Sequence, residues 1–229
     1  MPPNTGTCAF QVGSETYHTW FQIVGDLRST RTSGIRPLVV LHGGPGMSHH
    51  YMLPHTQLHG THNIPVIFYD QIGNGASTHL PDKPPTFWTL DLFMDELDNL
   101  LQFLGVSGEF DLLGHSWGCM LAAHYASHRH PAGMRRLVLV SGAPSMKLWQ
   151  EGANQLRDKL PKETRDMLEE HERDGTTGDQ EYQDAMQAFS NKHICRLVPW
   201  PEELLTSFAI MEKEPIVYAT MCVFVFCLF

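Results

Sequence analysis

A serine lies between two glycines in the segment GHSWG at residues 114–118. A short apolar run precedes this segment and a stretch with helical spacing follows it. In a tight turn from a buried strand to a helix, flanking glycines leave room for a strained backbone that pushes the central hydroxyl into the open. Ser116 is therefore predicted to be a nucleophile for acyl transfer. The backbone N–H of Trp117, at the helix start, would donate to the oxyanion. A chance match in an ordinary turn is the alternative.

A second glycine-rich segment, HGGPG at residues 42–46, directly follows an apolar run that ends at Leu41. Its position predicts that the backbone N–H of Gly43 or Gly44 is the other oxyanion donor, because glycine lets a substrate carbonyl approach the main chain closely. Pro45 would stiffen this loop, with a cis bond as one form. A plain glycine turn is the alternative.

The elements that must position these segments alternate between strand and helix, which favours an α/β fold with a mostly parallel sheet. Residues 7–24 read as a hairpin, and a helix begins after an N-cap at Thr89 and stops at Gly105. The other strands are expected at 37–41, 64–69, 110–114 and 137–142, with a helix at 117–128.

Residues beyond Pro144 are rich in charged residues, glutamine and methionine with helical spacing. We expect a core at 1–145, a helical cap at 146–221 and an atypical apolar tail at 222–229. The tail is far too short for a membrane span of about 20 residues.

Three segments resemble the proline iminopeptidases, which are related to tricorn-interacting aminopeptidases and amino-acid amidases. They are HGGPG at 42–46, DQIGNGAST at 70–78 and GHSWGCMLAAHYA at 114–126. The resemblance continues to about Met221. It implies the α/β-hydrolase fold and the release of an N-terminal residue, often proline, from a peptide or amide through an acyl-enzyme, with no metal or organic cofactor.

The same resemblance implies an acidic group that holds the free amino group of the substrate. By local similarity within residues 207–221, this group would be Glu212. A surface helix on which Glu212 and Glu214 are solvated charges is the alternative.

Composition limits the partners. Sixteen Lys and Arg against twenty-five Asp and Glu give a net charge of −9, mostly on the helical unit. That balance argues against a nucleic-acid surface and favours a cationic substrate. The cysteines are scattered and no signal peptide or membrane segment is visible, so a reduced, cytoplasmic location is expected. The oligomeric state is left open.

The histidines outside these motifs fall into a cluster at a helix end and a histidine-rich loop. His124, His128 and His130 are expected to cluster at a helix end, and Cys119 to be a packed helix residue. A histidine-rich loop follows HGGPG and has no assigned role, with metal binding as one alternative. Its members are His49, His50, His55, His59 and His62.

The acid and the histidine base that complete a serine triad should follow later strands. No such strands are visible after Ser116, and His171 and His193 lie in the helical unit. The sequence therefore predicts a truncated or aberrantly ended member, possible loss of activity, and an exposed strand near 137–140 that lowers solubility. A carboxylesterase or lipase, or a non-catalytic binding protein on the same scaffold, are the rival functions.

Overall fold

The computed structural model describes residues 4–28 and 34–222. These residues form two compact units, which are described separately. The first contains the described residues up to Gly142 together with Glu203–Cys222, and the second contains Ala143–Glu202. The predicted tail after Cys222 lies outside the described residues.

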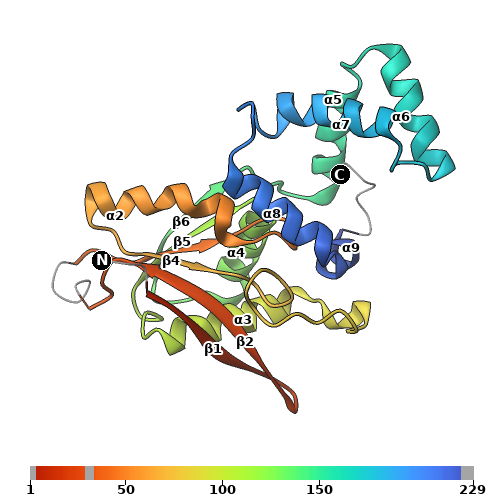
Figure 1. The fold of residues 1–229 in the computed structure, drawn as a ribbon. Coiled ribbons are helices and arrows are strands. Elements are labelled where there is room, and N and C mark those ends of the chain that lie inside the picture. Colours follow the sequence, from red (N-terminus) through yellow and green to blue (C-terminus); the bar gives the residue numbers. More distant parts are fainter. Residues whose placement is uncertain (1–3, 29–33, 223–229) are drawn as a thin grey trace. The chain divides into compact units, whose positions relative to one another are not determined.

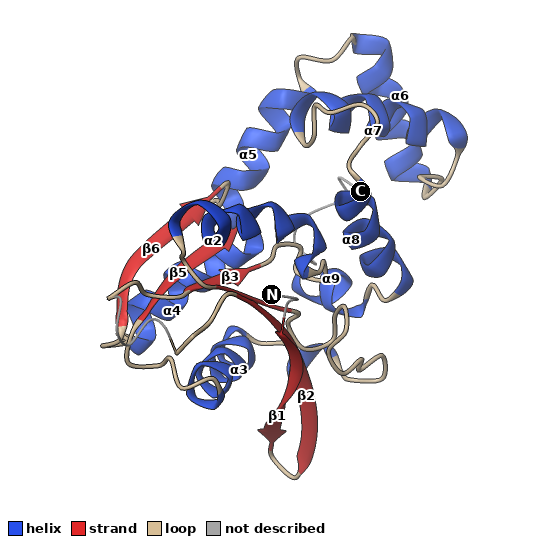
Figure 2. Ribbon diagram, turned by 60° about the vertical axis from the view of Figure 1, so that its left-hand side comes forward, coloured by secondary structure: helices blue, strands red, loops and turns tan. Residues whose placement is uncertain are grey.

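The first unit is built on a six-stranded sheet of order β1-β2-β4-β3-β5-β6 (Figures 1 and 2). Strand β2 runs antiparallel to both of its neighbours, β1 and β4, whereas β4, β3, β5 and β6 are parallel. The predicted hairpin and the mostly parallel sheet are thus confirmed. The strands are β1 Asn4–Val12, β2 Glu15–Val24, β3 Leu38–Leu41, β4 Val66–Tyr69, β5 Phe110–His115 and β6 Met134–Val140.

Helices cover both faces of this sheet, as the right-handed crossover rule requires. One face packs against α3 and α4, and the other against η1 and α2 (Figure 1). The strands β3 and β4 are buried along their whole length because both faces are covered. The bounds are η1 His49–Thr56, α2 Gln57–His62, η2 Pro85–Phe87, α3 Leu90–Phe103, α4 Trp117–Arg129, α8 Glu202–Lys213 and α9 Ile216–Met221.

Local sequence signals account for the start of α3. The Thr89 hydroxyl accepts a hydrogen bond from the Leu92 N–H at 3.1 Å, which is the predicted N-cap. The apolar stripe of this helix includes Phe93, Leu97 and Leu100, all fully buried. One carboxylate, Glu96, lies on the same buried stripe.

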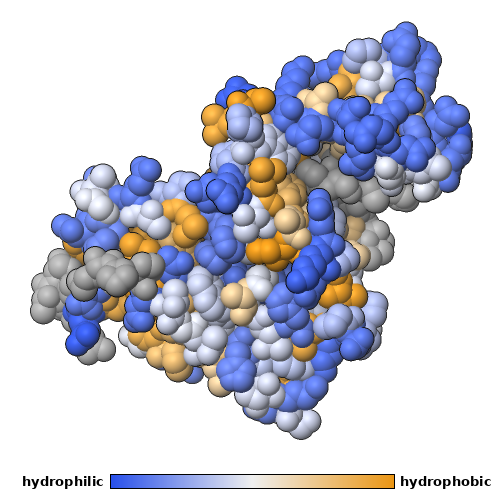
Figure 3. All heavy atoms as spheres, in the orientation of Figure 1, coloured by the Kyte–Doolittle hydropathy of each residue, from blue (hydrophilic) through white to orange (hydrophobic). Residues whose placement is uncertain are grey.

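The second unit is a small helical body with its own apolar cluster. Its helices are α5 Met146–Arg157, α6 Lys162–Asp174 and α7 Gln180–His193. Leu168, Tyr182 and Phe189 pack at its centre, and Arg157 forms an ion pair with Glu172 at 3.1 Å. The visible face of this unit is mostly hydrophilic (Figure 3).

The boundaries of the units differ from the predicted domains in one respect. The sequence grouped all residues 146–221 as a cap, whereas α9 and all of α8 after Glu202 pack with the first unit. Ser207 on α8 is fully buried, with its hydroxyl 3.1 Å from that of Ser48. A cap role for the helical residues stays a prediction. No helix within the described residues is long and apolar enough to cross a bilayer.

The strand β6 is an edge of the sheet within the described residues and carries apolar side chains on both faces. Val138 is 41% exposed and Leu139 is 50% exposed. Because an apolar edge strand can pair with another chain, we expect Leu139→Lys to raise the concentration at which light scattering detects aggregates. Leu148→Lys, at a similarly exposed leucine of α5, is the control. If both variants raised the aggregation concentration equally, the β6 edge would not be the site of aggregation.

Candidate active site

Ser116 occupies the turn between β5 and α4. Its φ of 54° and ψ of −117° place a non-glycine residue in a strained region of the backbone map. The Ser116 N–H donates to Val140 O at 2.9 Å, which anchors the turn to β6. A Cβ on Gly118 would lie 2.4 Å from Leu41 O, so this position has room only for glycine. The residues flanking the strained serine therefore have the geometry that a nucleophilic serine requires.

Trp117 is the first residue of α4. The first N–H groups of a helix have no acceptor within the helix, so its backbone N–H is available to a developing negative charge. Its indole Nε1–H donates to Gln71 Oε1 at 2.9 Å. The ring is buried, so the side chain anchors the turn, and the role of the Trp117 N–H as an oxyanion donor stays a prediction.

The glycine-rich loop after β3 lies against this turn. A Cβ on Gly43 would be 3.0 Å from Ser116 Cβ and 3.1 Å from His115 O. The Gly43 N–H donates to the Tyr51 hydroxyl at 2.6 Å, and that hydroxyl is 2.9 Å from His115 Nδ1. The Gly44–Pro45 peptide bond is cis. Both predicted oxyanion glycines thus lie in the loop beside Ser116, but the Gly43 amide already has an acceptor.

Gln71, two residues after the end of β4, links the two glycine-rich segments. Besides accepting from Trp117, its side-chain amide donates to His42 O at 3.1 Å, and its backbone N–H donates to His42 Nε2 at 3.0 Å. His42 Nδ1 is 2.9 Å from Gly43 O, so the neutral ring donates there and accepts at Nε2. Burial lowers the pKa of His42, which keeps this tautomer neutral.

Asp70, the residue before Gln71, holds the loop that follows HGGPG. Its Oδ1 accepts from the His49 backbone N–H at 2.8 Å and from His49 Nδ1 at 2.9 Å, and its Oδ2 accepts from the Ala76 N–H at 2.9 Å. Burial alone would raise its pKa, but the hydrogen bonds from His49 and from the Ala76 N–H lower it. Asp70 is therefore an ionised structural anchor.

Glu96 of α3 supports the loop after β4, which contains Asp70 and Ile72. Its carboxylate accepts from the Thr19 hydroxyl at 2.6 Å and from the Ile72 N–H at 2.9 and 3.1 Å. Complete burial raises the pKa of Glu96 to about 8. The sequence pattern assigned no role to Asp70, Gln71 or Glu96. A polar pair at the end of a buried strand, and a carboxylate on an apolar helical stripe, were the available signals.

Glu212, the predicted amine-binding residue, is exposed on α8. Among the described residues its carboxylate has no hydrogen bond or ion pair. Glu214 instead pairs with His79, whose Nε2 lies 2.7 Å from Gly75 O. The structure thus links this segment to the DQIGNGAST loop through Glu214, and the role of Glu212 stays a prediction.

Three of the remaining histidines have contacts in the structure, whereas the buried Nδ1 of His59 has no hydrogen-bond partner among the described residues. His55 Nδ1 donates to Met52 O at 2.8 Å, while His124 and His128 stack with ring centroids 3.6 Å apart at the end of α4. Across residues 4–28 and 34–222, no group of three or more His, Cys, Asp or Glu side chains is arranged to hold a metal ion. Cys119 is buried in α4, as predicted for a packed residue.

No histidine within the described part of the chain is hydrogen-bonded to the Ser116 hydroxyl. His171 is bonded to Thr176 O, and its ring is 3.8 Å from Asp179, all within the second unit. The base and the acid of a triad therefore stay unassigned in this structure.

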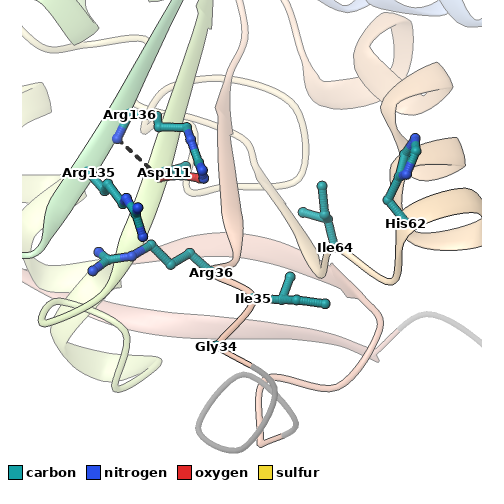
Figure 4. Close-up of a pocket in the computed structure, with 8 residues that line it drawn as sticks. All are labelled: Gly34, Ile35, Arg36, His62, Ile64, Asp111, Arg135 and Arg136. Carbon is teal, nitrogen blue, oxygen red and sulfur yellow. Dashed lines mark hydrogen bonds and ion pairs between the residues drawn. The ribbon is translucent and has the colours of Figure 1, made fainter.

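A cavity of about 290 Å³ lies at the other end of the strands, near the start of β6 (Figure 4). Its lining includes three arginines. Two of them already have partners in the protein: Arg136 pairs with Asp111 at 2.9 Å, and Arg36 donates to Gly133 O at 2.8 Å. Ligands of open parallel sheets bind beyond the carboxyl ends of the strands, where Ser116 lies. The cavity is thus separate from the candidate active site.

Comparison with known proteins places these features in a family. A sequence profile described as the alpha/beta hydrolase fold matches residues 36–192. Proline iminopeptidase from Lactobacillus helveticus (strain DPC 4571) is 36% identical over 187 residues, covering 81% of this chain and 61% of that protein. The corresponding protein of Clostridium botulinum (strain Hall / ATCC 3502 / NCTC 13319 / Type A) is 36% identical over 182 residues, or 80% and 59%.

Two solved structures are also similar. VinJ is 45% identical with a TM-score of 0.86, covering 95% of this chain and 71% of that chain. Proline iminopeptidase of Mycobacterium smegmatis is 40% identical with a TM-score of 0.81, covering 93% and 70%. The chain spans about three fifths of the length of the curated relatives it matches. Its sheet, its serine turn and these similarities together show that it belongs to the proline iminopeptidase family of the α/β-hydrolase fold.

Proposed function

We propose that the protein is a serine hydrolase of the aminopeptidase type, which releases the N-terminal residue of a peptide or amide. The strained backbone of Ser116 between β5 and α4 is the observation that carries this proposal. Ser116 Oγ would attack the carbonyl carbon of the first residue and lose its proton. The amine of the remaining peptide would leave with a proton, and water would then hydrolyse the acyl-enzyme.

Several features support a small substrate with a free amino group. The relatives named above are proline iminopeptidases, and the net charge of −9 attracts cations. Glu212 would bind the substrate ammonium group, as the family resemblance implies. The described cysteines are all free, which supports the predicted cytoplasmic location.

A non-catalytic binding protein on this scaffold is the second candidate. The observation that favours it is the Ser116 hydroxyl, which has no histidine partner within residues 4–28 and 34–222. Removal of the base of a serine triad costs about 10⁶ in kcat, so a chain without one would retain binding but little turnover.

A fluorophosphonate probe with mass analysis of the labelled peptide separates these candidates. We expect labelling of wild-type protein at Ser116, its loss in Ser116→Ala, and its retention in Ser127→Ala, which alters a serine on the exposed part of α4. Hydrolysis of aminoacyl arylamides in preference to p-nitrophenyl butyrate would favour the aminopeptidase over an esterase. A folded protein that neither labels nor hydrolyses either substrate would favour the binding protein.

A further inference from the structure

Gln71 is fully buried, and its side-chain amide contacts both of the segments that carry the predicted chemistry. Its Oε1 accepts from the Trp117 indole N–H at 2.9 Å, and its Nε2 donates to His42 O at 3.1 Å. The indole can only donate and the carbonyl can only accept, so these two partners fix which end of the amide faces which segment. One planar group therefore connects the serine turn to the HGGPG loop.

The bond to His42 O sets the direction of the Gly43 N–H. The two groups belong to one peptide unit, and because this peptide bond is trans they point to opposite sides. Gln71 holds the carbonyl side, while the N–H on the other side donates to the Tyr51 hydroxyl at 2.6 Å. This peptide unit lies beside the nucleophile, since a Cβ on Gly43 would be 3.0 Å from Ser116 Cβ.

The backbone of Gln71 acts on the next peptide unit through the His42 ring. The Gln71 N–H donates to His42 Nε2 at 3.0 Å. Nε2 is therefore unprotonated, and the ring proton lies on Nδ1, which is 2.9 Å from Gly43 O. That bond holds the carbonyl side of the Gly43–Gly44 peptide, and the Gly44 N–H points the other way. Gln71 thus orients both glycine amides that are predicted as donors, whichever of them meets the substrate.

The side chain of Gln71 also holds the residue that carries the other predicted donor. The indole of Trp117 is a rigid group joined to its backbone through two torsions. Its ring packs edge-on against Phe93, with the ring centroids 5.8 Å apart, and its N–H is held by Gln71. A fixed indole restricts the backbone of Trp117, so the start of α4 keeps its position relative to the HGGPG loop.

The neighbours of Gln71 in the chain are fixed as well. Asp70 accepts from the Ala76 N–H at 2.9 Å, and the Ile72 N–H donates to Glu96 at 2.9 Å. With the main chain anchored before and after it, Gln71 has a fixed position from which to hold both segments. Groups that stabilise a developing charge act best when they are placed before the reaction, because no free energy is then spent on moving them.

We propose that Gln71 is a positioning residue for the oxyanion site, which fixes the separation and the direction of the glycine amides and of the Trp117 N–H. It does not touch the substrate, and it transfers no proton. The inference rests on the proposed acyl transfer at Ser116. The opposing interpretation is that Gln71 only joins three loops for stability. Its loss would then lower the folded fraction and leave the kinetics of the folded molecules unchanged.

Gln71→Met tests the inference, because methionine has a similar length but makes neither side-chain hydrogen bond. We expect kcat for an aminoacyl arylamide to fall by about 10² with KM little changed, as for a small misplacement of groups that act in the transition state. A proline boronic acid, whose adduct with Ser116 mimics the oxyanion, should bind more weakly by a similar factor. Rates and affinities are compared per folded molecule, with the folded fraction taken from circular dichroism.

Asn99→Asp is the matched control. The Asn99 side-chain amide also donates to a main-chain carbonyl, Ala9 O at 2.8 Å. It joins α3 to β1, which three strands separate from the strand that leads to Ser116. This variant should keep wild-type kcat and boronate affinity. An equal loss in Asn99→Asp, or wild-type kcat and affinity in Gln71→Met, would overturn the inference.

Gln71→Glu adds a readout that a merely structural role would not move. An ionised carboxylate still accepts from the Trp117 indole, but it cannot donate to His42 O. Once protonated, the same group can donate to that carbonyl through its O–H. We therefore expect kcat and boronate affinity, each relative to wild type at the same pH, to be closer to wild type at pH 6 than at pH 9. Wild-type values at both pH values would show that the acid stays protonated and keeps the bond. An equal loss at both would overturn the role of the His42 contact.

The failure of this inference is distinguishable from the failure of the proposed function. If Ser116→Ala abolishes a turnover that Gln71→Met leaves intact, the proposed function stands and the positioning role fails. If wild-type protein does not turn over but binds the boronate, the boronate affinities alone decide. A wild-type chain that does neither overturns both.

Should the Gln71 variants not fold, Trp117→Phe replaces them. This variant keeps an aromatic ring and the backbone N–H but loses the indole donor to Gln71. The inference requires boronate affinity to fall by about tenfold or more, because the start of α4 is then no longer tied to the HGGPG loop. Wild-type affinity in Trp117→Phe would overturn it.

Discussion

Gly118→Ala is expected to destabilise the first unit by at least about 3 kcal/mol, because the new methyl group would meet main-chain atoms that cannot move independently. A Cβ at this position would lie 2.4 Å from Leu41 O and 2.6 Å from His42 O. Relief would require α4 to move away from β3, which carries the HGGPG loop. The backbone conformation of Gly118 is helical, so the cost comes from contact and not from alanine itself.

Gly152→Ala is the matched control for this experiment. Gly152 lies inside α5, and a Cβ there would meet nothing within 4 Å. Alanine should stabilise that helix by about 0.5–1 kcal/mol. Urea unfolding followed by circular dichroism measures both variants. A Gly118→Ala protein as stable as wild type would contradict the close approach of α4 to β3.

The local parts of the site are predictable from sequence because they depend on residues that are neighbours in the chain. The strained position of Ser116 needs small residues on either side, and the GHSWG segment displays them. The cap at Thr89 is equally local, since donor and acceptor are three residues apart. A buried parallel strand is a short apolar run, which also identified β3 and β4.

The parts that sequence did not reveal depend on contacts between distant residues. The hydroxyl of Tyr51 meets His115 across 64 positions, and Ser207 meets Ser48 across 159. No periodicity encodes such pairs. The packing of α8 with the first unit was likewise not predictable, because charge and helical spacing do not show which unit a helix packs against.

The environment of Glu96 could be predicted from the sequence in part. The spacing of Phe93, Leu97 and Leu100 defines a buried stripe, and Glu96 falls within it. A carboxylate at such a position must find hydrogen-bond donors or remain protonated. The sequence could thus identify an unusual acid, but its partners Thr19 and Ile72 come from β2 and the loop after β4.

The raised pKa of Glu96 makes the stability of the protein depend on pH. Its folded pKa of about 8 exceeds the ordinary value of 4.5. The unfolded chain therefore releases this proton more readily. The stability that the buried neutral acid contributes is present at low pH and is lost as pH rises through 8. Between pH 4.5 and pH 8 the loss is on the order of 5 kcal/mol at 1.36 kcal/mol per pKa unit.

The range from pH 7 to pH 9 spans the folded pKa of Glu96. The raised pKa values of Cys8, Cys119 and Cys222 add a further loss of stability as pH approaches 9, so the difference between wild type and Glu96→Gln is the quantity that reports on Glu96. Burial lowers the pKa values of His42 and His115, so their contribution is lost only as pH falls below the ordinary value of 6.5. The lowered pKa of Asp70 acts at still lower pH, below its ordinary value of 3.8. Wild-type protein should lose about 1–2 kcal/mol between pH 7 and pH 9 through Glu96.

Glu96→Gln should remove most of this loss, because an amide keeps an acceptor for the Thr19 hydroxyl but does not ionise. Glu203→Gln, at an exposed residue of the same unit, should leave the slope unchanged. Urea midpoints at pH 7, 8 and 9 measure all three proteins. Parallel slopes for wild type and Glu96→Gln would mean that Glu96 is already ionised at pH 7. The Ile72 N–H would then be held by a charged carboxylate, and the DQIGNGAST loop would be anchored by buried charge at both Glu96 and Asp70.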